Sequence, residues 1–248
     1  MANIYNALDF GLDPSNTASG NQVALQDAVT QAQQNFGGQI VIPSFGSYSI
    51  SGTVTITADI TTAIHIVGSS GSALFVKNDA SDLFSITNTN AGDGVFFEDI
   101  HVRYSGTFSN VAAFRFARCR NGRLHRVTME DCPLGAVFSD CQQCSVSECR
   151  SLYGAQNNST LITIDTAGFG GTSQTRIYAC DFEVGTTATG CAGLSVTQSS
   201  DLSVDDSLFA GFANAITIAA ASAQSVVRSL FRGISCQTTS TAVTVKLK

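Results

Sequence analysis

The 248-residue sequence has no tryptophan, three prolines and only 13% charged residues, and its apolar residues never form a long uninterrupted run. Since no apolar stretch reaches about 18 residues, we expect no membrane-spanning helix. The formal net charge of −6 argues against a general nucleic-acid binder, which would carry a basic surface. The amino terminus, Met1 to Tyr5, lacks the basic and apolar regions of a signal peptide. We therefore expect synthesis in a cytoplasm, with neither a membrane nor a nucleic acid as partner.

The residues that are present suffice for one elongated domain with a continuous core, because 44% of them are hydrophobic and 16 are phenylalanine. With charge so scarce, the surface must be built largely from Ser, Thr, Asn and Gln. Such a surface is typical of parallel β-solenoids, in which stacked polar side chains hydrogen-bond along the ladder.

Short segments of alternating apolar and polar residues recur at a fixed spacing. The alternation has the period of a strand and not that of a helix. Phe116 and Phe138 lie 22 residues apart, and so do Val196 and Ile218. The similar stretches 204–211 and 226–233 repeat this spacing. A repeat of this length predicts a solenoid, and its strand periodicity makes the fold class all-β, a right-handed single-stranded parallel β-helix.

Two inward positions can be followed from one turn to the next. The first holds Ile100, Val127, Cys149, Cys180, Ser207 and Ser229. The second holds Val102, Met129, either Ser151 or Leu152, Phe182, Phe209 and Phe231. We therefore expect Phe116 to contact Phe138, and Phe209 to contact Phe231. Longer spacings mark surface loops, of which the clearest runs from Gly168 to Gln174.

The eight cysteines are explained by these inward positions better than by a disulfide framework. Cys119 and Cys141 should stack at a distance that a disulfide tolerates, yet we expect a reduced ladder of small apolar side chains. Cys141 and Cys144 have the spacing of a metal or redox site, but no second such pair or His pair accompanies them. We expect no metal and no cofactor.

Residues 1–50 differ in kind from the rest and are predicted to cap the coil. Ser19 or Asn21 can begin a helix, Gly37-Gly38 ends it, and a strand follows from Gln39 to Pro43. The apolar face of the helix consists of Leu25, Ala28, Val29 and Ala32. Residues 51–248 form the coils, in a single domain with the cap. The end, Thr241 to Lys248, is expected to be a last strand that completes the chain, with lysines that discourage further pairing.

The amino-terminal region resembles a signature of the pectate-lyase-like β-helix superfamily. The matching residues are Asp9-Phe10-Gly11, then Ala24, Gln26, Ala28 and Ala32 of the helix, then Gly37-Gly38, Val41-Ile42-Pro43, Gly46, Tyr48 and Ile50. The superfamily includes polysaccharide lyases, glycoside hydrolases and bacteriophage tailspikes. The resemblance implies a right-handed parallel β-helix, and it leaves the activity open.

The sequence departs from the enzymes of that superfamily. The aspartate-rich stretch that usually precedes the helix is replaced by Ala18 to Gln22. Asp205-Asp206 is the only aspartate pair and no histidine follows it, so the polygalacturonase-type constellation is absent. We nominate no catalytic residue.

Many charged residues are expected to pair between turns and so to be structural. One outward position holds Asp99, Arg126, Glu148, Ala179, Asp206 and Arg228. Two further pairs are Arg150 with Asp181 and Arg103 with Glu130. His65 and His101 receive no role.

The remaining candidate is a carbohydrate-contact patch on one outward face. It consists of His125, Arg150, Tyr178, Asp181 and Glu183. A tyrosine ring can stack on a sugar while arginine and acids bind hydroxyls or a carboxylate. The alternative is an ordinary polar ladder. A locally basic cluster could meet an anionic glycan; its members are Arg115, Arg118, Arg120, Arg123 and Arg126.

These features favour a virion-associated structural or adhesion spike of a phage-like particle, located on the virion. We expect it to contact cell-surface polysaccharide and other virion proteins, and to be a homotrimer. The alternative is a polysaccharide lyase or glycoside hydrolase. A third possibility is a subunit whose coil only spaces other components.

Overall fold

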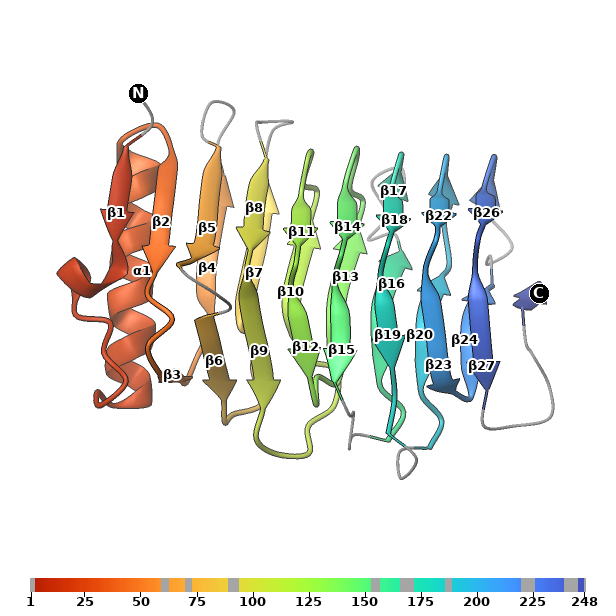
Figure 1. The fold of residues 1–248 in the computed structure, drawn as a ribbon. Helices are drawn as coiled ribbons and strands as arrows, with labels where there is room; N and C mark the ends of the chain where they lie inside the picture. The colour runs from red at the N-terminus through yellow and green to blue at the C-terminus, as the bar shows by residue number, and fades with distance from the viewer. Residues whose placement is uncertain are drawn as a thin grey trace.

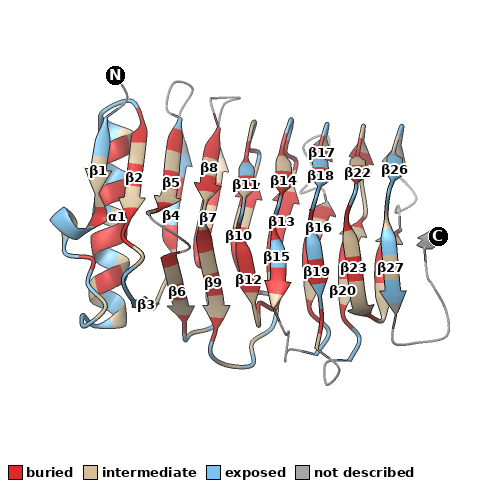
Figure 2. Ribbon diagram, viewed as in Figure 1, coloured by how far each residue is buried: buried red, intermediate tan, exposed pale blue. Residues whose placement is uncertain are grey.

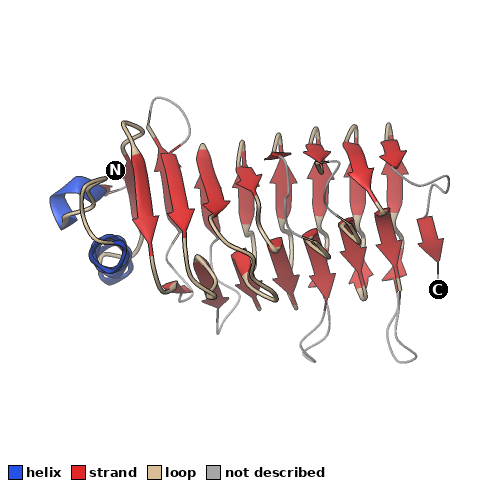
Figure 3. Cartoon of the chain, turned by 90° about the horizontal axis from the view of Figure 1, so that it is seen from below, coloured by secondary structure: helices blue, strands red, loops and turns tan. Residues whose placement is uncertain are grey.

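The computed structural model describes residues 3–58, 63–69, 73–88, 94–152, 157–165, 172–185, 189–219, 226–238 and 245–247. These residues form the predicted right-handed parallel β-helix, in which strands of successive turns pair in parallel (Figure 1). The view from below in Figure 3 shows the coil running away from helix α1 (Ala18–Gln34) at its amino-terminal end.

Three long sheets, A, B and C, form the walls of the coil. Sheet A consists of β1 (Ile4–Asn6), β2 (Gly38–Ile42), β5 (Ile64–Gly68), β8 (Val95–Glu98), β11 (Arg123–His125), β14 (Ser145–Ser147), β18 (Arg176–Tyr178), β22 (Ser203–Asp205) and β26 (Leu230–Arg232). Sheet B consists of β3 (Ser47–Ile50), β6 (Ala73–Lys77), β9 (Ile100–Tyr104), β12 (Thr128–Glu130), β15 (Arg150–Leu152), β19 (Asp181–Glu183), β23 (Leu208–Phe212) and β27 (Ser235–Thr238). Sheet C consists of β4 (Val54–Ala58), β7 (Phe84–Asn88), β10 (Ala112–Ala117), β13 (Leu134–Ser139), β16 (Thr160–Asp165), β20 (Ala192–Val196), β24 (Asn214–Ile218) and β28 (Val245–Leu247).

A small fourth sheet lies between sheets C and A. It consists of β17 (Thr172–Ser173), β21 (Ser199–Ser200) and β25 (Val226–Val227). The prediction of a loop from Gly168 to Gln174 is therefore wrong in part. Residues 168–171 lie outside the described residues, but Thr172 and Ser173 form β17, which pairs with β21. A longer turn can resume parallel backbone hydrogen bonding wherever a neighbouring strand offers a free edge.

The interior is a stack of apolar side chains, as the buried positions along the strands in Figure 2 show. Phe116 and Phe138 are register partners with stacked rings, 4.9 Å between centroids. This confirms the first of the two predicted phenylalanine contacts. The inward residues Ile100, Val127, Cys149, Cys180 and Ser207 are also buried on successive turns. Met129 pairs with Ser151, which settles the choice between Ser151 and Leu152.

The second predicted contact, between Phe209 and Phe231, is wrong. Phe209 pairs with Cys236, whereas Phe231 pairs with Val204 and is 36% exposed on the last described strand of sheet A. The repeat is 22 residues from Val196 to Ile218 but 27 from Val204 to Phe231, so five additional residues enter after Ile218. For the same reason Ser229 does not follow Ser207 in the ladder, because Ser235 N–H donates to Ser207 O.

From β8 onward, each strand of sheet A turns into sheet B through one residue in the left-handed conformation. These corner residues have φ between 47° and 60°; they are Asp99, Arg126, Glu148, Ala179, Asp206 and Gly233. None is β-branched, as expected where such side chains clash with the backbone. A second row, between sheets C and A, has φ between 52° and 58° and consists of Asn121, Gln143, Gln174, Asp201 and Arg228. Arg228 therefore belongs to this second row and not to the position of Asp206.

Helix α1 covers the first edge of the coil. Its buried face contains the predicted Leu25, Ala28, Val29 and Ala32. The predicted N-caps are wrong: Thr17 caps the helix by accepting a hydrogen bond from Gly20 N–H, because its extended backbone precedes the first turn. Asn21 lies inside the helix and is buried, where it binds Asp13 N–H and Ser49 O. In the described residues, no helix combines the length and apolar character that crossing a bilayer requires.

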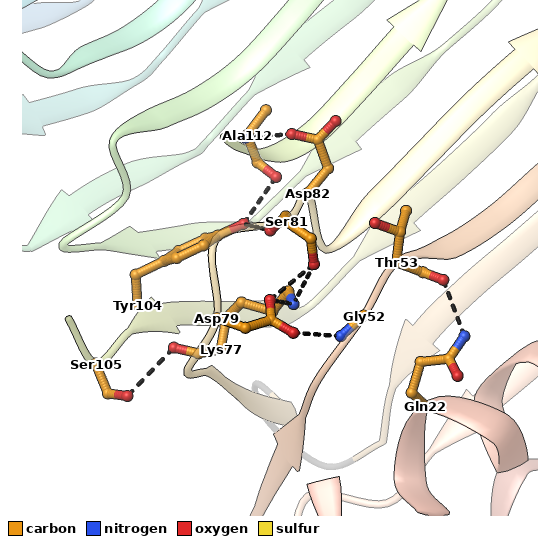
Figure 4. A network of polar contacts seen from close by, with 10 residues as sticks. All are labelled: Gln22, Gly52, Thr53, Lys77, Asp79, Ser81, Asp82, Tyr104, Ser105 and Ala112. Atoms are coloured by element: carbon orange, nitrogen blue, oxygen red, sulfur yellow. Dashed lines mark hydrogen bonds and ion pairs between the residues drawn. The ribbon is translucent and has the colours of Figure 1, made fainter. Parts of the chain in front are cut away.

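Glutamine side chains of α1 take the place of a missing strand beside β4. Gln26 accepts a hydrogen bond from Thr55 N–H at 2.8 Å and donates to Thr55 O at 2.9 Å. Gln22 donates to Thr53 O at 2.9 Å, as Figure 4 shows. The Thr53 carbonyl and both Thr55 backbone groups are thereby paired, which opposes edge-to-edge association.

A buried ionic network joins sheets B and C in the second turn (Figure 4). The Lys77 side chain is fully buried, and its ammonium contacts Asp79 and donates to the Ser81 hydroxyl at 2.7 Å. Burial lowers the pKa of Lys77, and hydrogen bonding to Asp79 acts against this shift. The Tyr104 hydroxyl donates to Ala112 O at 2.9 Å, and burial raises its pKa.

Candidate functional site

The outer face of sheet A carries two columns of side chains, because alternate residues of each strand point outward. The inward residues between the columns, including Leu124, Val146 and Ile177, are buried. In order of successive strands, the first column reads His65, Phe96, Arg123, Ser145, Arg176 and Ser203. The second column reads Val67, Glu98, His125, Ser147, Tyr178 and Asp205.

A groove opens where the side chains of these columns are small. Strand β14 presents only Ser145 and Ser147, between strands that present an arginine with a ring. One hollow of about 440 Å³ extends from His65 to Tyr178, and a second of about 480 Å³ shares Ser145 and Tyr178 with it. Because neighbouring strands are about 4.8 Å apart, the flanking strands β11 and β18 are separated by roughly 9.5 Å. We call this surface the sheet A groove.

Two arginines in the groove lie over aromatic rings. The Arg123 guanidinium is 5.0 Å from the centre of the Phe96 ring, and that of Arg176 is 5.8 Å from the Tyr178 ring. Among the described residues, neither has a carboxylate at ion-pair distance. Tyr178 is 38% exposed. The groove therefore offers ring faces and cationic donors together.

A chain of polar contacts crosses the other end of the groove. Glu98 contacts His65 at 2.9 Å and Arg126 at 2.5 Å, and Arg126 also donates to His125 Nε2 at 2.6 Å. Because arginine only donates, His125 Nε2 is the acceptor, so its Nδ1–H is assigned as the donor to Ser147 Oγ at 3.0 Å. In this tautomer His125 cannot take a proton from Ser147. The pair therefore lacks the arrangement of a serine nucleophile with its base.

The carboxyls with displaced pKa values are held in the ionised form. The hydrogen bond from Arg126 lowers the pKa of Asp99, and those from Arg232 and Ser203 lower the pKa of Asp205. The pKa of Asp13 is lowered by Ser15. For Asp79, burial alone would raise the pKa, but hydrogen bonds led by that from Lys77 outweigh it, and the pKa is lowered. Acid catalysis of glycosidic cleavage needs the opposite shift.

The cysteines offer no activated nucleophile in the groove. All eight are free, and Cys119 and Cys141 lie on neighbouring turns without a disulfide. Burial raises the pKa of Cys119 to about 12. The Cys141 thiol donates to the main-chain oxygens of Phe116 and Ser139. These contacts suit the expected packing role, since only a thiolate is a good nucleophile or metal ligand.

The five predicted contact residues lie on two sheets that meet at the left-handed corner, and not on one face. His125 and Tyr178 point outward from sheet A, within the groove. Arg150, Asp181 and Glu183 belong to β15 and β19 of sheet B. The corner could not be predicted from composition, because a left-handed residue other than glycine leaves no clear compositional mark.

Neither Ser145 nor Arg176 was among the predicted site residues, and Arg123 was predicted only as part of a basic cluster. Two similar segments of the sequence could have identified both arginines. In Arg123-Leu-His125 and Arg176-Ile-Tyr178, an arginine lies two positions before the predicted contact residue. Strand periodicity places both members of each pair on the same face.

The predicted charge pairs are partly correct. Arg126 binds Asp99 at 2.7 Å, as expected. Arg228 instead binds Asp201 at 2.7 Å, because of the five additional residues after Ile218. Arg150 is in register with Asp181 and Arg103 with Glu130, yet Arg150 donates to Thr128 and Glu130 contacts His101 at 2.8 Å.

The predicted basic cluster is spread over several surfaces. Arg115 on sheet C binds Asp82 at 2.6 Å, and Arg120 donates to Gln143 at 2.9 Å. Arg123 and Arg126 both lie near the groove, but Arg126 is engaged by Glu98 and Asp99. Arg123 alone of these four projects into the groove without a carboxylate contact among the described residues.

No protein-family model and no curated protein matches the sequence. Solved structures do match the fold. One is Geobacillus virus E2 ORF18, with a TM-score of 0.56, 13% identity, and coverage of 95% of this chain and 60% of that one. A second is PfbA, a surface adhesin of Streptococcus pneumoniae (TM-score 0.64, 12% identity, 87% and 59% coverage). A third is the tailspike protein of E. coli bacteriophage HK620 (TM-score 0.58, 14% identity, 98% and 48% coverage).

This chain therefore has the parallel β-helix fold of phage tailspikes and of a bacterial adhesin. It spans between 48% and 60% of the length of those proteins. One HK620 tailspike structure is a complex with a pentasaccharide. At such low identity the likeness shows the fold alone.

Proposed function

We propose that this protein is an adhesion spike of a phage-like particle, and that it contacts cell-surface polysaccharide through the sheet A groove. The observation that carries the proposal is the groove itself, which presents Tyr178, Phe96 and two arginines over a floor of serines. Ring faces pack against the apolar faces of sugars, and arginine and serine donate to hydroxyls. The occurrence of the same fold in tailspikes and in an adhesin supports this function.

Binding to polysaccharide is preferred over cleavage because of the groove's chemistry. Glu98 is engaged by a histidine and an arginine, and Asp205 is held ionised by Arg232. His125 is oriented by Arg126 and not by a carboxylate. A lyase or hydrolase would need a free acid or base at this surface.

A panel of capsular and pectic polysaccharides tests the proposal. We expect the protein to bind at least one of them, and Tyr178→Ala to weaken binding by about tenfold, the value of one lost stacking contact. Phe45→Ala is the matched control, because Phe45 is 64% exposed on the first turn, away from the groove. Absence of binding across the panel, or equal loss in both variants, would refute the proposal. New reducing ends or unsaturated uronides would instead indicate a depolymerase.

The other parts of the proposal concern sheet B and the assembly. Arg150, Asp181 and Glu183 would extend the contact surface around the corner, and Glu183→Gln tests them in the same panel. We also propose a homotrimer located on the virion together with other virion proteins. Native mass spectrometry checks the trimer, and a mass of one chain at micromolar concentration would reject it.

A further inference from the structure

Arg123 and Arg176 occupy the same column on either side of Ser145. Other arginines at this surface are neutralised: Arg126 binds two carboxylates, and Arg232 binds Asp205 at 2.7 Å. Within the described residues, the two arginines that flank Ser145 have no such partner. On a protein with a net charge of −6, two guanidinium groups thus lie at one place without a directly bound carboxylate in the described part of the chain, and Arg176 interacts with Asp205 only at longer range.

The stacked arrangement fixes both cations with their donors available. A guanidinium that lies over a ring uses its face for the contact and keeps its N–H edge free for hydrogen bonds. The rings of Phe96 and Tyr178 therefore orient Arg123 and Arg176 without consuming their donors. The flanking strands are roughly 9.5 Å apart, so one oxyanion above Ser145 lies within reach of both side chains.

The acids of the groove do not oppose an anion at this position. Glu98 lies one strand beyond Arg123 in the second column and is engaged by His65 and Arg126. Asp205 lies one strand beyond Tyr178 and is engaged by Arg232. Both carboxylates are thus offset by their own cations, whereas Ser145 and Ser147 between them are neutral.

We propose that the sheet A groove selects a negatively charged glycan, whose oxyanion is held between Arg123 and Arg176 above Ser145. This inference rests on the proposed function and names its ligand class. Guanidinium pairs match the geometry of carboxylate and phosphate oxygens. The oxyanion is thus supplied either by the carboxylate of a sugar acid or by a phosphodiester between sugars.

Matched pairs of polymers test the inference with the full chain. The probes are a polyuronate and the same polymer after carboxyl reduction, together with a phosphodiester-linked glycan and its dephosphorylated repeat unit. We expect binding of at least one anionic probe, and about tenfold weaker binding of its neutral counterpart. The pair that shows the difference identifies the source of the oxyanion.

The variants Arg123→Gln and Arg176→Gln should each weaken anionic binding by about tenfold. Arg103→Gln is the matched control, since it removes the same charge from β9 of sheet B; it should change binding by less than about twofold. Equal binding of neutral and anionic probes, still sensitive to Tyr178→Ala, would overturn the inference and leave the proposed function intact. Absence of binding to every probe would overturn both, and equal losses in all three variants would show a nonspecific charge effect.

Discussion

The buried Lys77 provides the sharpest test of how the coil is held together. Its side chain is fully buried, while Asp79 retains 34% exposure and also accepts hydrogen bonds from Gly52 and Ser81. Lys77 and Asp79 therefore differ in how far their charged groups reach water. Asp79→Asn leaves a buried ammonium without a counter-charge, at a cost of about 3 kcal/mol, the lower end for broken buried pairs because Ser81 still accepts one N–H. Lys77→Met leaves a carboxylate that reaches water, at a cost of about 1 kcal/mol or less.

The double variant Lys77→Met/Asp79→Asn should be within about 1 kcal/mol of the natural protein, giving a coupling of about 3 kcal/mol between the two sites. Urea unfolding followed by far-ultraviolet circular dichroism measures these values. An equal loss of stability in Lys77→Met and Asp79→Asn, or a double variant that shows the sum of both losses, would contradict this unequal role of the two partners.

The pH dependence gives an independent check on the same pair. Burial lowers the pKa of Lys77, and the loss of Asp79 removes a contact that raises it. In Asp79→Asn the folded state then binds fewer protons than the unfolded state. Its stability should therefore rise as the pH increases toward the unfolded pKa of about 10.4. If Asp79→Asn lost the same free energy of unfolding at pH 7 and at pH 9.5, the titration of Lys77 would not account for that loss.

Three further predictions concern the cap, the corner and sheet B. Gln26→Ala should lower the free energy of unfolding by about 1 kcal/mol, because both Thr55 backbone groups lose their partner. The control Gln31→Ala, at an exposed position of α1, should lower it by less than about 0.5 kcal/mol. Ala179→Gly should be tolerated and Ala179→Val should destabilise by about 1 to 2 kcal/mol, because φ is 53° there. Burial lowers the pKa of His101 despite its contact with Glu130, so the stability it contributes is present above pH 6.5 and is lost as the pH falls below it.

Each of these predictions has a distinct measurement. Urea midpoints compare the glutamine variants, and equal losses would contradict the edge-pairing role of Gln26. Thermal unfolding compares the two Ala179 variants, and a reversed order would reject the left-handed corner. For sheet B, the loss of stability between pH 7 and pH 5 should be smaller in His101→Gln than in the natural protein. An equal loss would mean that His101 does not contribute to acid destabilisation.

The fold class, the stacking of Phe116 on Phe138 and the buried face of the capping helix could all be predicted from the sequence. These features depend on local periodicity: alternation at period two assigns inward and outward positions within one strand, and helical spacing assigns the face of α1. The outward directions of the His125 and Tyr178 side chains follow from the same rule. A side chain's direction within its own strand needs no information about other turns.

Where turns differ in length, the neighbours of a residue on adjacent turns could be identified only from the three-dimensional structure. The five additional residues after Ile218 move Phe231 from Phe209 to Val204, because backbone hydrogen bonds select where the chain rejoins the ladder. Left-handed corners divide the predicted contact patch between two sheets. Likewise, the register pairs the buried Lys77 with the buried Tyr104 of the next turn. These outcomes depend on contacts distant in sequence, and such contacts also place Arg123 and Arg176 on either side of Ser145.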